Sequence, residues 1–400
     1  MIKILVFAEG VSLAHPSRVS EICRQLQGSD FEFHIATPVG FHWIFKDMPN
    51  VYLYDHSTIS NETFNQRLFH VKFPYTWDEL QIFQQADGEL IKQIKPAMII
   101  SDFRLTAFVV AKKMGIPFVN LIHFHWHPSF KREPLLPYVK TVSIWGRRLS
   151  HVVAPFVAPL ILKQQTNFIN HFMEKHNFPA VKSIYEFYSA GDYKIFPDMM
   201  SLFDNPSLTS NEHFVGPFLW KNKETPWPSH WPRTTTARKT VYVTMGSTGN
   251  HQLVPKLVKN LSPEKYRIFI STSGHRYPDL ENRANVYLSD FVPAELVLSM
   301  ADVLICNGGT STTYQAISLG VPFFAFPLNM DQYLNCHQLK YKNVADYDHF
   351  DTLDFTTMDA RLDRLMASGE IRNNIDFLKR EIREIQERNP LKDVLKRVGV

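Results

Sequence analysis

Short apolar runs rich in β-branched residues alternate with stretches of helical spacing along most of this chain. The first three such runs are IKILVFA at 2–8, FEFHIAT at 31–37 and AMIISDF at 97–103. This alternation predicts a mostly parallel sheet with helices on both faces, because parallel strands need a crossover segment between them. The chain is therefore expected to begin with a doubly wound α/β domain.

The same alternation restarts after an interruption near the middle of the chain. Residues 205–240 hold five prolines and three tryptophans without periodicity, which is typical of an interdomain linker. A length of 400 residues also exceeds what one core usually serves. We therefore expect a second doubly wound domain, whose strands are TVYVTMG at 240–246, YRIFIST at 266–272, DVLICN at 302–307 and PFFAFP at 322–327.

The overall composition excludes several classes of protein. The net charge is only +4 and no long basic run occurs, so no nucleic-acid partner is expected. Three cysteines without a CxxC pair favour a reducing compartment. The first apolar run soon meets Glu9, which is typical of a strand and not of a signal peptide. We expect a cytoplasmic protein whose oligomeric state the sequence leaves open.

The longest apolar run is VVAPFVAPLIL at 152–162. Its eleven residues include two prolines, whereas a bilayer span needs about 20 apolar residues. We therefore predict no transmembrane segment. A buried loop or a wall of an acceptor pocket is the favoured interpretation, and peripheral contact with a membrane surface stays open.

Glycines crowd the ends of two strands in the second series. Gly246 and Gly249 follow its first strand, and Gly308 and Gly309 follow its third, although the chain has only 16 glycines. Glycine lets a ligand approach the backbone closely, and open parallel sheets bind ligands beyond the carboxyl ends of their strands. Ordinary turn glycines are the alternative. A helix is predicted to begin near Thr310, and its free N–H groups would suit an anion.

A resemblance to a known family is carried by the segment LSDFVPAELVLSMADVLICNGGTSTTYQAISLGVPFFAFPLNMDQYLNC. It is similar to the donor-binding signature of nucleotide-sugar-dependent glycosyltransferases of the UDP-glycosyltransferase type, close to bacterial macrolide and natural-product glycosyltransferases. Further parts of that family resemble KPAMIISDFRLTAFVVAKKMGIPFVNL, FVGPFLW and VYVTMGST. The resemblance implies the GT-B fold, in which two Rossmann-like doubly wound parallel-sheet domains face each other across a cleft.

The family architecture and the two series of strands together give the expected domain boundaries. Residues 1–215 would form an N-terminal acceptor-binding domain, and 216–239 the linker. Residues 240–379 would form the C-terminal domain that binds the nucleotide-sugar donor. Residues 380–400 would form a helix that crosses back to the N-terminal domain.

The family signature also implies which residues bind the donor. Its nucleobase contacts match Phe291 and Val292, and its sugar contacts match Asp331 and Gln332. Most of the remaining contacts are with the diphosphate. The implied donor-binding set is Gly246, Ser247, Phe291, Val292, Asn307, Gly308, Gly309, Thr310, Ser311, Thr312, Gln315, Asp331 and Gln332.

Two positions of this signature depart from the family pattern. Asn307 stands where a histidine usually donates to a donor phosphate, and Gln315 stands where a glutamate usually accepts from ribose hydroxyls. An amide donates and accepts without the strength of a charged group. UDP-sugars are favoured over dTDP-sugars as donors, and both the nucleoside and the sugar stay open.

Two residues of the first domain are candidates for the chemistry. His15 begins a predicted helix after the first strand, and Asp102 ends the strand AMIISD, so both lie at the carboxyl edge of one sheet. In the family a histidine at this place is the general base and an aspartate orients it, although the usual H-x-x-P is here His15–Pro16. Helix capping by both residues is the alternative. Arg104 is expected to pair with Asp102, with a substrate anion or with a surface acid.

The segment HFHWH places three histidines at alternating positions, which would share one face of a strand. A metal triad is an alternative, but the stretch resembles the acceptor-side wall of the family, so no metal and no resident cofactor are predicted. The residues expected to bind the acceptor are His123, His125 and Trp126.

These inferences predict an inverting glycosyltransferase that moves a sugar from a nucleoside-diphosphate-sugar to a hydroxyl of a small, apolar acceptor. A single in-line displacement, with His15 as base and Asp102 orienting it, would invert the anomeric configuration. The partners would be a sugar nucleotide and a small acceptor of open identity. Two alternatives are a nucleotide-sugar epimerase and a non-catalytic donor-binding accessory subunit.

Overall fold

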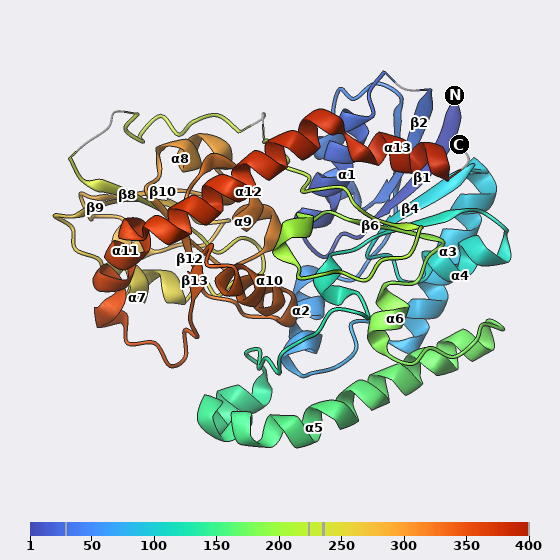
Figure 1. Cartoon of the computed structure of the whole chain (residues 1–400), viewed down its shortest axis with the longest axis horizontal. Helices are drawn as coiled ribbons and strands as arrows, with labels where there is room; N and C mark the ends of the chain where they lie inside the picture. Colours follow the sequence, from blue (N-terminus) through green and yellow to red (C-terminus); the bar gives the residue numbers. More distant parts are fainter. Residues whose placement is uncertain (29, 223–224, 234–236, 399–400) are drawn as a thin grey trace. The chain divides into compact units, whose positions relative to one another are not determined.

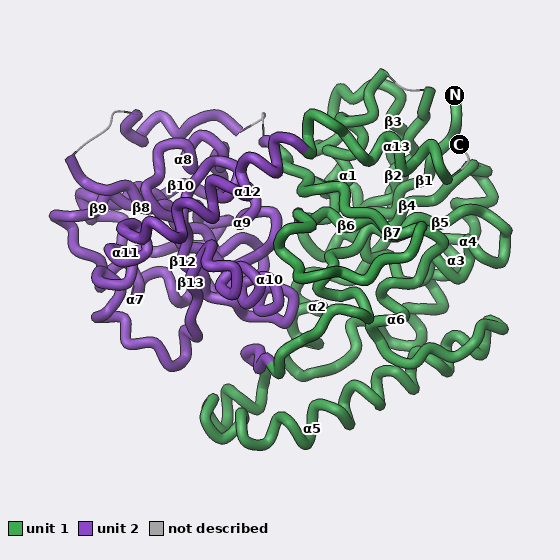
Figure 2. The backbone as a smooth tube through the Cα atoms, in the orientation of Figure 1, with its two compact units in different colours: residues 1–134, 139–220, 385–400 green, residues 135–138, 221–384 purple. Residues whose placement is uncertain are grey.

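The computed structural model describes residues 1–28, 30–222, 225–233 and 237–398. The chain forms two compact units, coloured separately in Figure 2. Unit 1 comprises Met1–Pro134, Val139–Trp220 and Ile385–Val400, and unit 2 comprises Leu135–Tyr138 and Lys221–Glu384. Of the predicted linker 216–239, residues 223–224 and 234–236 lie outside the described residues, as do 399–400 of the predicted last helix.

Unit 1 is built on a seven-stranded sheet in the order β3-β2-β1-β4-β5-β6-β7, and every paired strand is parallel. The order reverses between β1 and β4, which are neighbours in the sheet although two strands separate them in sequence. The central strands are buried on both faces, as near-continuous apolar runs require. The strands are β1 Ile2–Ala8, β2 Phe31–Thr37, β3 Val51–Asp55, β4 Met98–Asp102, β5 Phe118–Leu121, β6 Tyr193–Phe196 and β7 Glu212–Phe214.

Helices follow most of these strands and bury their apolar faces against the sheet (Figure 1). Local sequence fixes several of their ends; at the start of α3, for example, Thr76 and Glu79 form a reciprocal capping box. The helices of unit 1 are α1 Ala14–Gln25, η1 Val39–Phe45, α2 Asn61–Phe69, α3 Trp77–Ile94, α4 Ala107–Lys113, η2 Phe124–Trp126, α5 Lys140–Lys175, α6 Ile184–Tyr188, η3 Met200–Leu202 and α13 Pro390–Arg397.

Unit 2 has a six-stranded parallel sheet in the order β10-β9-β8-β11-β12-β13, with its reversal between β8 and β11. The strands are β8 Lys239–Thr244, β9 Tyr266–Ser271, β10 Val286–Ser289, β11 Val303–Cys306, β12 Phe323–Ala325 and β13 Asp346–Tyr347. The helices are α7 Leu253–Lys259, η4 Pro278–Leu280, α8 Ala294–Met300, α9 Thr310–Leu319, α10 Met330–Tyr341, η5 Phe355–Thr357, α11 Met358–Ala367 and α12 Gly369–Arg388. Two Rossmann-like doubly wound sheets therefore confirm the predicted fold class.

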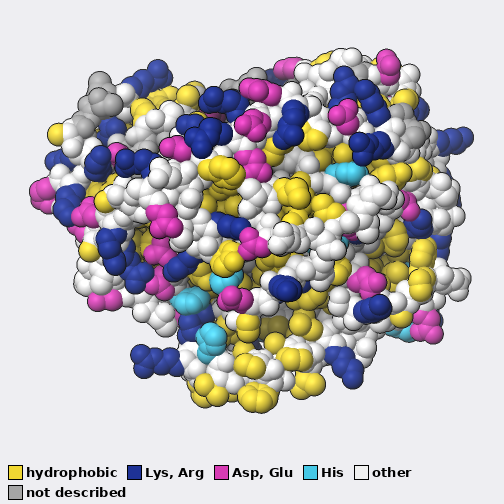
Figure 3. Space-filling model, viewed as in Figure 1, with side chains coloured by type: hydrophobic (Ala, Val, Ile, Leu, Met, Phe, Trp, Pro, Cys, Tyr) yellow, Lys and Arg dark blue, Asp and Glu magenta, His cyan; other side chains and the backbone are white. Residues whose placement is uncertain are grey.

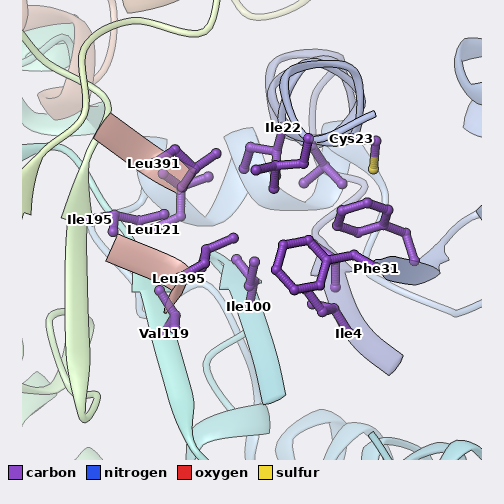
Figure 4. Close-up of a cluster of buried hydrophobic side chains, with 14 of the residues drawn as sticks. Ile4, Ile22, Cys23, Phe31, Ile100, Val119, Leu121, Ile195, Leu391 and Leu395 are labelled. Carbon is purple, nitrogen blue, oxygen red and sulfur yellow. The ribbon is translucent and has the colours of Figure 1, made fainter. Parts of the chain in front are cut away.

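The last helix of the chain belongs to the core of unit 1. Leu391 and Leu395 of α13 are fully buried and lie among side chains of α1, β4 and β5, as Figure 4 shows. Gly216 marks the close approach of the end of α12, since a Cβ at this residue would lie 2.5 Å from Cγ2 of Ile385. The first and last segments of the sequence thus share one hydrophobic core.

Two local predictions were wrong. The segment HFHWH does not form a strand: Phe124–Trp126 is a turn of 3-10 helix after β5, so the three histidines do not share a pleated face. The run 152–162 is neither a loop nor buried, because it lies within the long helix α5 and most of its side chains are exposed. Among the described residues, no helix combines the length and the apolar character needed to cross a membrane.

Candidate active site

His15 and Asp102 meet at the edge of the unit 1 sheet where the strand order reverses. Asp102 is the last residue of β4 and pairs in register with Ala8, the last residue of β1. His15 lies in the first turn of α1, directly after the loop that follows β1. Its Nδ1 lies 2.8 Å from Oδ1 of Asp102. The carboxylate is buried, whereas the imidazole side chain keeps 16% of its surface exposed.

Arg18 completes this site and was missed by the sequence analysis. Its Nε donates to Oδ2 of Asp102 and its Nη2 to Oδ1, each over 2.9 Å. Burial raises the pKa of the Asp102 carboxyl, but the charges of Arg18 and His15 and the hydrogen bonds they donate outweigh it and lower the pKa well below its usual value. The available signal was spacing: Arg18 is three residues after His15, hence on the same face of α1.

The hydrogen bonds define the tautomer of His123. A guanidinium only donates, so the 2.6 Å contact from Nη1 of Arg18 makes Nε2 of His123 an acceptor. Nδ1 of His123 then carries the proton and donates to Asp198 over 2.7 Å. The same logic does not fix His15, because its Nδ1 lies 2.8 Å from Oδ1 of Asp102, to which it can donate, and 3.0 Å from Nη2 of Arg18, from which it can only accept. No described residue forms a hydrogen bond with Nε2 of His15, the ring nitrogen that would act as the base.

Phe103 holds the other side of the His15 ring. The two rings are stacked, with centroids 5.7 Å apart and planes 15° from parallel. Phe103 has φ 65°, a left-handed conformation that a bulky residue adopts only under constraint. The strained residue directly follows Asp102, so one turn both presents the carboxylate and positions the aromatic ring.

The residues predicted to contact the acceptor are largely occupied by protein partners. His123 is buried in the Arg18–Asp198 network, and His125, also buried, stacks on it with ring centroids 5.3 Å apart. Trp126 keeps some exposure and packs on Tyr188. Their role in acceptor binding stays a prediction.

Two of the proposed partners of Arg104, Asp102 and a surface acid, were wrong, and pairing with a substrate anion stays a prediction. Arg104 is 4% exposed and binds Asp87 of α3, with 2.9 Å between Nε and Oδ1. It therefore serves the interior of unit 1 and not its surface. Among the described residues, no group of three His, Cys, Asp or Glu side chains is arranged to hold a metal ion.

In unit 2 the predicted donor loops also lie at the reversal of strand order. Gly246 and Ser247 follow β8, and Asn307, Gly308 and Gly309 follow its neighbour β11. Parallel strands end at the same edge of a sheet, so these loops share one rim.

A single hydroxyl, that of Thr248, joins these loops to the start of α10, which holds Asp331 and Gln332. It accepts from Nδ2 of Asn307 over 3.2 Å and from Nε2 of Gln332 over 2.9 Å. The other amide atoms are also used within the protein. Oδ1 of Asn307 accepts from the N–H of Gly309, and Oε1 of Gln332 accepts from the N–H of Leu328. Both amides therefore shape the rim, while Asp331 beside them stays partly exposed.

Packing inside the protein explains the first of the two adjacent glycines of the rim, Gly308, but not the second, Gly309. Gly308 has φ 79°, and a Cβ there would overlap with Sγ of Cys336, so internal packing alone requires glycine. Gly309 has ordinary dihedral angles, and a Cβ would only meet Oδ1 of Asn307 at 3.6 Å. The protein itself leaves room for a side chain at Gly309, so its own packing does not explain the glycine.

Gly309 is also the N-cap of α9 and supplies no side-chain acceptor to that helix. The first N–H groups of a helix have no intrahelical partner and attract anions. The predicted diphosphate residues Thr310, Ser311 and Thr312 form this first turn, and Gln315 lies one turn further on. Elsewhere on the unit, Phe291 leaves 61% of its surface exposed and Val292 is buried.

Comparisons with known proteins identify the class of enzyme to which this fold belongs. Residues 240–388 match the family model described as the glycosyltransferase family 28 C-terminal domain. The chain is a glycosyltransferase of the GT-B type. The epimerase alternative is therefore wrong.

Relatives of this glycosyltransferase cover nearly its whole length. A PGL/p-HBAD biosynthesis rhamnosyltransferase of Mycobacterium bovis is 29% identical over 335 residues, 83% of this chain and 74% of the relative. A PGL/p-HBAD biosynthesis glycosyltransferase of Mycobacterium tuberculosis is 27% identical over 372 residues, 92% of this chain and 86% of the relative. The crystal structure of the kitacinnamycin glycotransferase superposes with a TM-score of 0.74 at 17% identity, covering 99% of this chain and 98% of the other.

Replacement of Arg18 should destabilise unit 1 strongly. Arg18→Met leaves the buried Asp102 carboxylate without its bidentate partner, and we expect a loss of about 3–5 kcal/mol in the free energy of unfolding. Guanidinium denaturation measures it. Arg18→Met combined with Asp102→Asn removes both charges and should lose less than the sum of the two single variants. Additive losses would contradict a coupled ion pair.

Replacement of Gly308 should destabilise unit 2, because a side chain there would overlap with Cys336. We expect Gly308→Ala to lose about 2–5 kcal/mol of stability from left-handed strain and overpacking. In a Cys336→Ala background the same substitution should lose clearly less, since the overlapping sulfur is gone. Denaturation of the four proteins of this cycle gives the difference, and equal losses in both backgrounds would refute the packing explanation.

Proposed function

We propose that this glycosyltransferase transfers a sugar from a nucleoside-diphosphate-sugar to a hydroxyl of a small apolar acceptor, with inversion at the anomeric carbon. The observation that carries the proposal is the His15 imidazole, whose Nδ1 is held by Asp102 while no described residue bonds its Nε2. An alcohol is a poor nucleophile until a positioned base removes its proton in the transition state.

In the proposed step the acceptor oxygen gives its proton to Nε2 of His15 and forms a bond to the anomeric carbon. The bond from that carbon to the phosphate oxygen breaks, and the nucleoside diphosphate leaves with the electron pair. Asp102 stabilises the imidazolium that forms. The N–H groups at the start of α9 stabilise the negative charge that develops on the leaving group. The step uses no metal ion and no resident cofactor, and a single displacement inverts the configuration.

The donor residues of this proposal are those of the unit 2 rim. The exposed ring of Phe291 would stack on the nucleobase, with the backbone of Val292 beside it. Asp331, partly exposed next to the capping amide of Gln332, would accept from sugar hydroxyls. Uridine is favoured over thymidine as the nucleoside. The name of the Mycobacterium bovis relative supports rhamnose as one donor sugar to test.

Aromatic packing beside His15 supports an apolar acceptor. Phe103, stacked on the imidazole, also contacts Phe64 and Tyr188, each with ring centroids 6.0 Å away. Phe64 and Phe103 are only partly buried. Apolar pockets with a few convergent polar groups are typical of small-molecule sites.

Replacement of His15 should lower the turnover rate strongly and leave donor binding unchanged. We expect His15→Ala to lower kcat by roughly 100- to 10,000-fold, with an unchanged increase in melting temperature on addition of UDP. His70→Ala, which removes an exposed histidine of the same unit, is the matched control and should keep full activity.

The same assay decides between the proposal and its alternatives. Activity that does not respond to His15→Ala would refute the base, and a product with the donor's anomeric configuration would refute single displacement. Donor binding without turnover by the native protein, across a panel of UDP- and dTDP-sugars and hydroxylated acceptors, would instead favour the accessory-subunit alternative.

Gly309→Ala should separate binding from stability. The new Cβ meets only Oδ1 of Asn307 inside the protein, so the melting temperature without ligand should not change. The methyl group would occupy the approach to the N–H groups of α9, and we expect roughly tenfold weaker UDP binding or more by calorimetry, which is about 1.4 kcal/mol. Gly369→Ala, in open space on the same unit, should change neither quantity. Unchanged affinity in Gly309→Ala would exclude diphosphate binding at this rim.

A further inference from the structure

Helix α5 exposes an unusual amount of apolar surface. Its C-terminal part is anchored in unit 1, where Ile169, Phe172 and Met173 are buried. Upstream, all six residues of 155–160 are exposed, and Phe156 leaves 76% of its surface uncovered. Large exposed apolar patches on a protein mark sites of contact with another protein, a membrane or a ligand.

The exposed apolar residues are ordered along the helix. Leu149, Val152, Phe156 and Leu160 are spaced by three or four residues, so they form one stripe. Trp145, 52% exposed, precedes them just before the kink at 146. Figure 3 shows hydrophobic side chains gathered along the lower edge, over α5, with Lys and Arg side chains on either side of them.

The charge around the stripe has one sign. Residues 134–173 contain no Asp or Glu. At the chain average of 39 acidic residues in 400, such a stretch of 40 would carry about four. Lys140, Arg148 and Lys163 are exposed on the same helix. The exposed apolar residues, the basic residues around them and the nearby tryptophan suit contact with the surface of an anionic membrane.

We infer that α5 docks this glycosyltransferase on the surface of an anionic lipid bilayer, with the stripe Leu149–Val152–Phe156–Leu160 inserted among the acyl chains. This inference goes beyond the proposed function and does not require turnover. The exposed basic residues and the lack of acidic residues over 134–173 favour an anionic lipid surface over a partner protein.

Ring contacts connect the anchored end of α5 with the candidate base. Phe168 of α5 packs on Phe73, Phe73 on Tyr188, and Tyr188 on Phe103, with centroids 5.3, 6.3 and 6.0 Å apart. Phe103 in turn stacks on His15. Given the proposed function, the docked helix would bring this apolar side of unit 1 against the phase in which an apolar acceptor dissolves.

Sedimentation with lipid vesicles tests the inference. The native protein should bind vesicles containing about 30% phosphatidylglycerol, bind pure phosphatidylcholine vesicles much more weakly, and release in about 0.5 M salt. Phe156→Glu with Leu160→Glu should lower the partition coefficient at least roughly tenfold. Arg148→Glu with Lys163→Glu should lower binding to anionic vesicles only.

The control is Ile82→Glu with Phe377→Glu, which changes two exposed apolar residues elsewhere by the same charge. It should bind like the native protein, as should His15→Ala, so failure of docking and failure of the catalytic proposal are distinguishable. No binding by the native protein, or an equal loss in the control, overturns the inference. So does a native dimer in light scattering that Phe156→Glu with Leu160→Glu converts to monomer, because a second copy would then cover the stripe.

Discussion

The reversal of strand order in each sheet is the constraint from which the candidate site follows. Where two neighbouring parallel strands send their helices to opposite faces, their carboxyl ends cannot be covered by either helix. In unit 1 this happens at β1 and β4, and in unit 2 at β8 and β11. Asp102 ends β4 and His15 lies in the first turn of α1 just after the β1 loop, while Gly246 and Gly309 follow β8 and β11, so all four residues lie at these two reversals.

A buried carboxylate makes the unit 1 reversal chemically specific. Asp102 would be expensive to bury alone, and Arg18 offsets that penalty with two hydrogen bonds while also fixing His123. His15 thus approaches a carboxylate that Arg18 already holds in position, and the charge and hydrogen bond of His15 lower the pKa of that carboxyl further. The rim of unit 2 is organised differently, because the neutral hydroxyl of Thr248 holds its amides in place. A buried ion pair thus organises the candidate site of unit 1, and neutral hydrogen bonds organise the rim of unit 2.

The sequence predicted what depends on local pattern and failed where tertiary contacts decide. Nearly continuous apolar runs predicted the central strands, whereas β3, VYLYD, is a short, half-exposed strand at the edge of its sheet, and β13 has two residues. Spacing and the family signature identified His15 and Asp102. They did not identify Arg18, because nothing near it in the chain shows that Asp102, 84 residues away, is its partner. Alternation suggested a strand at HFHWH, but Asp198 draws its backbone and His123 into a tight turn.

The burial of α13 inside unit 1 affects the order in which the two units can fold during synthesis. Leu391 and Leu395 follow all of unit 2 in the sequence, so the core of unit 1 lacks these side chains while unit 2 already has all its residues. Domains usually finish in the order of their synthesis. Here unit 1 is completed only after unit 2 has been synthesised, and until then Ile22 and Leu121 lack their packing partners from α13.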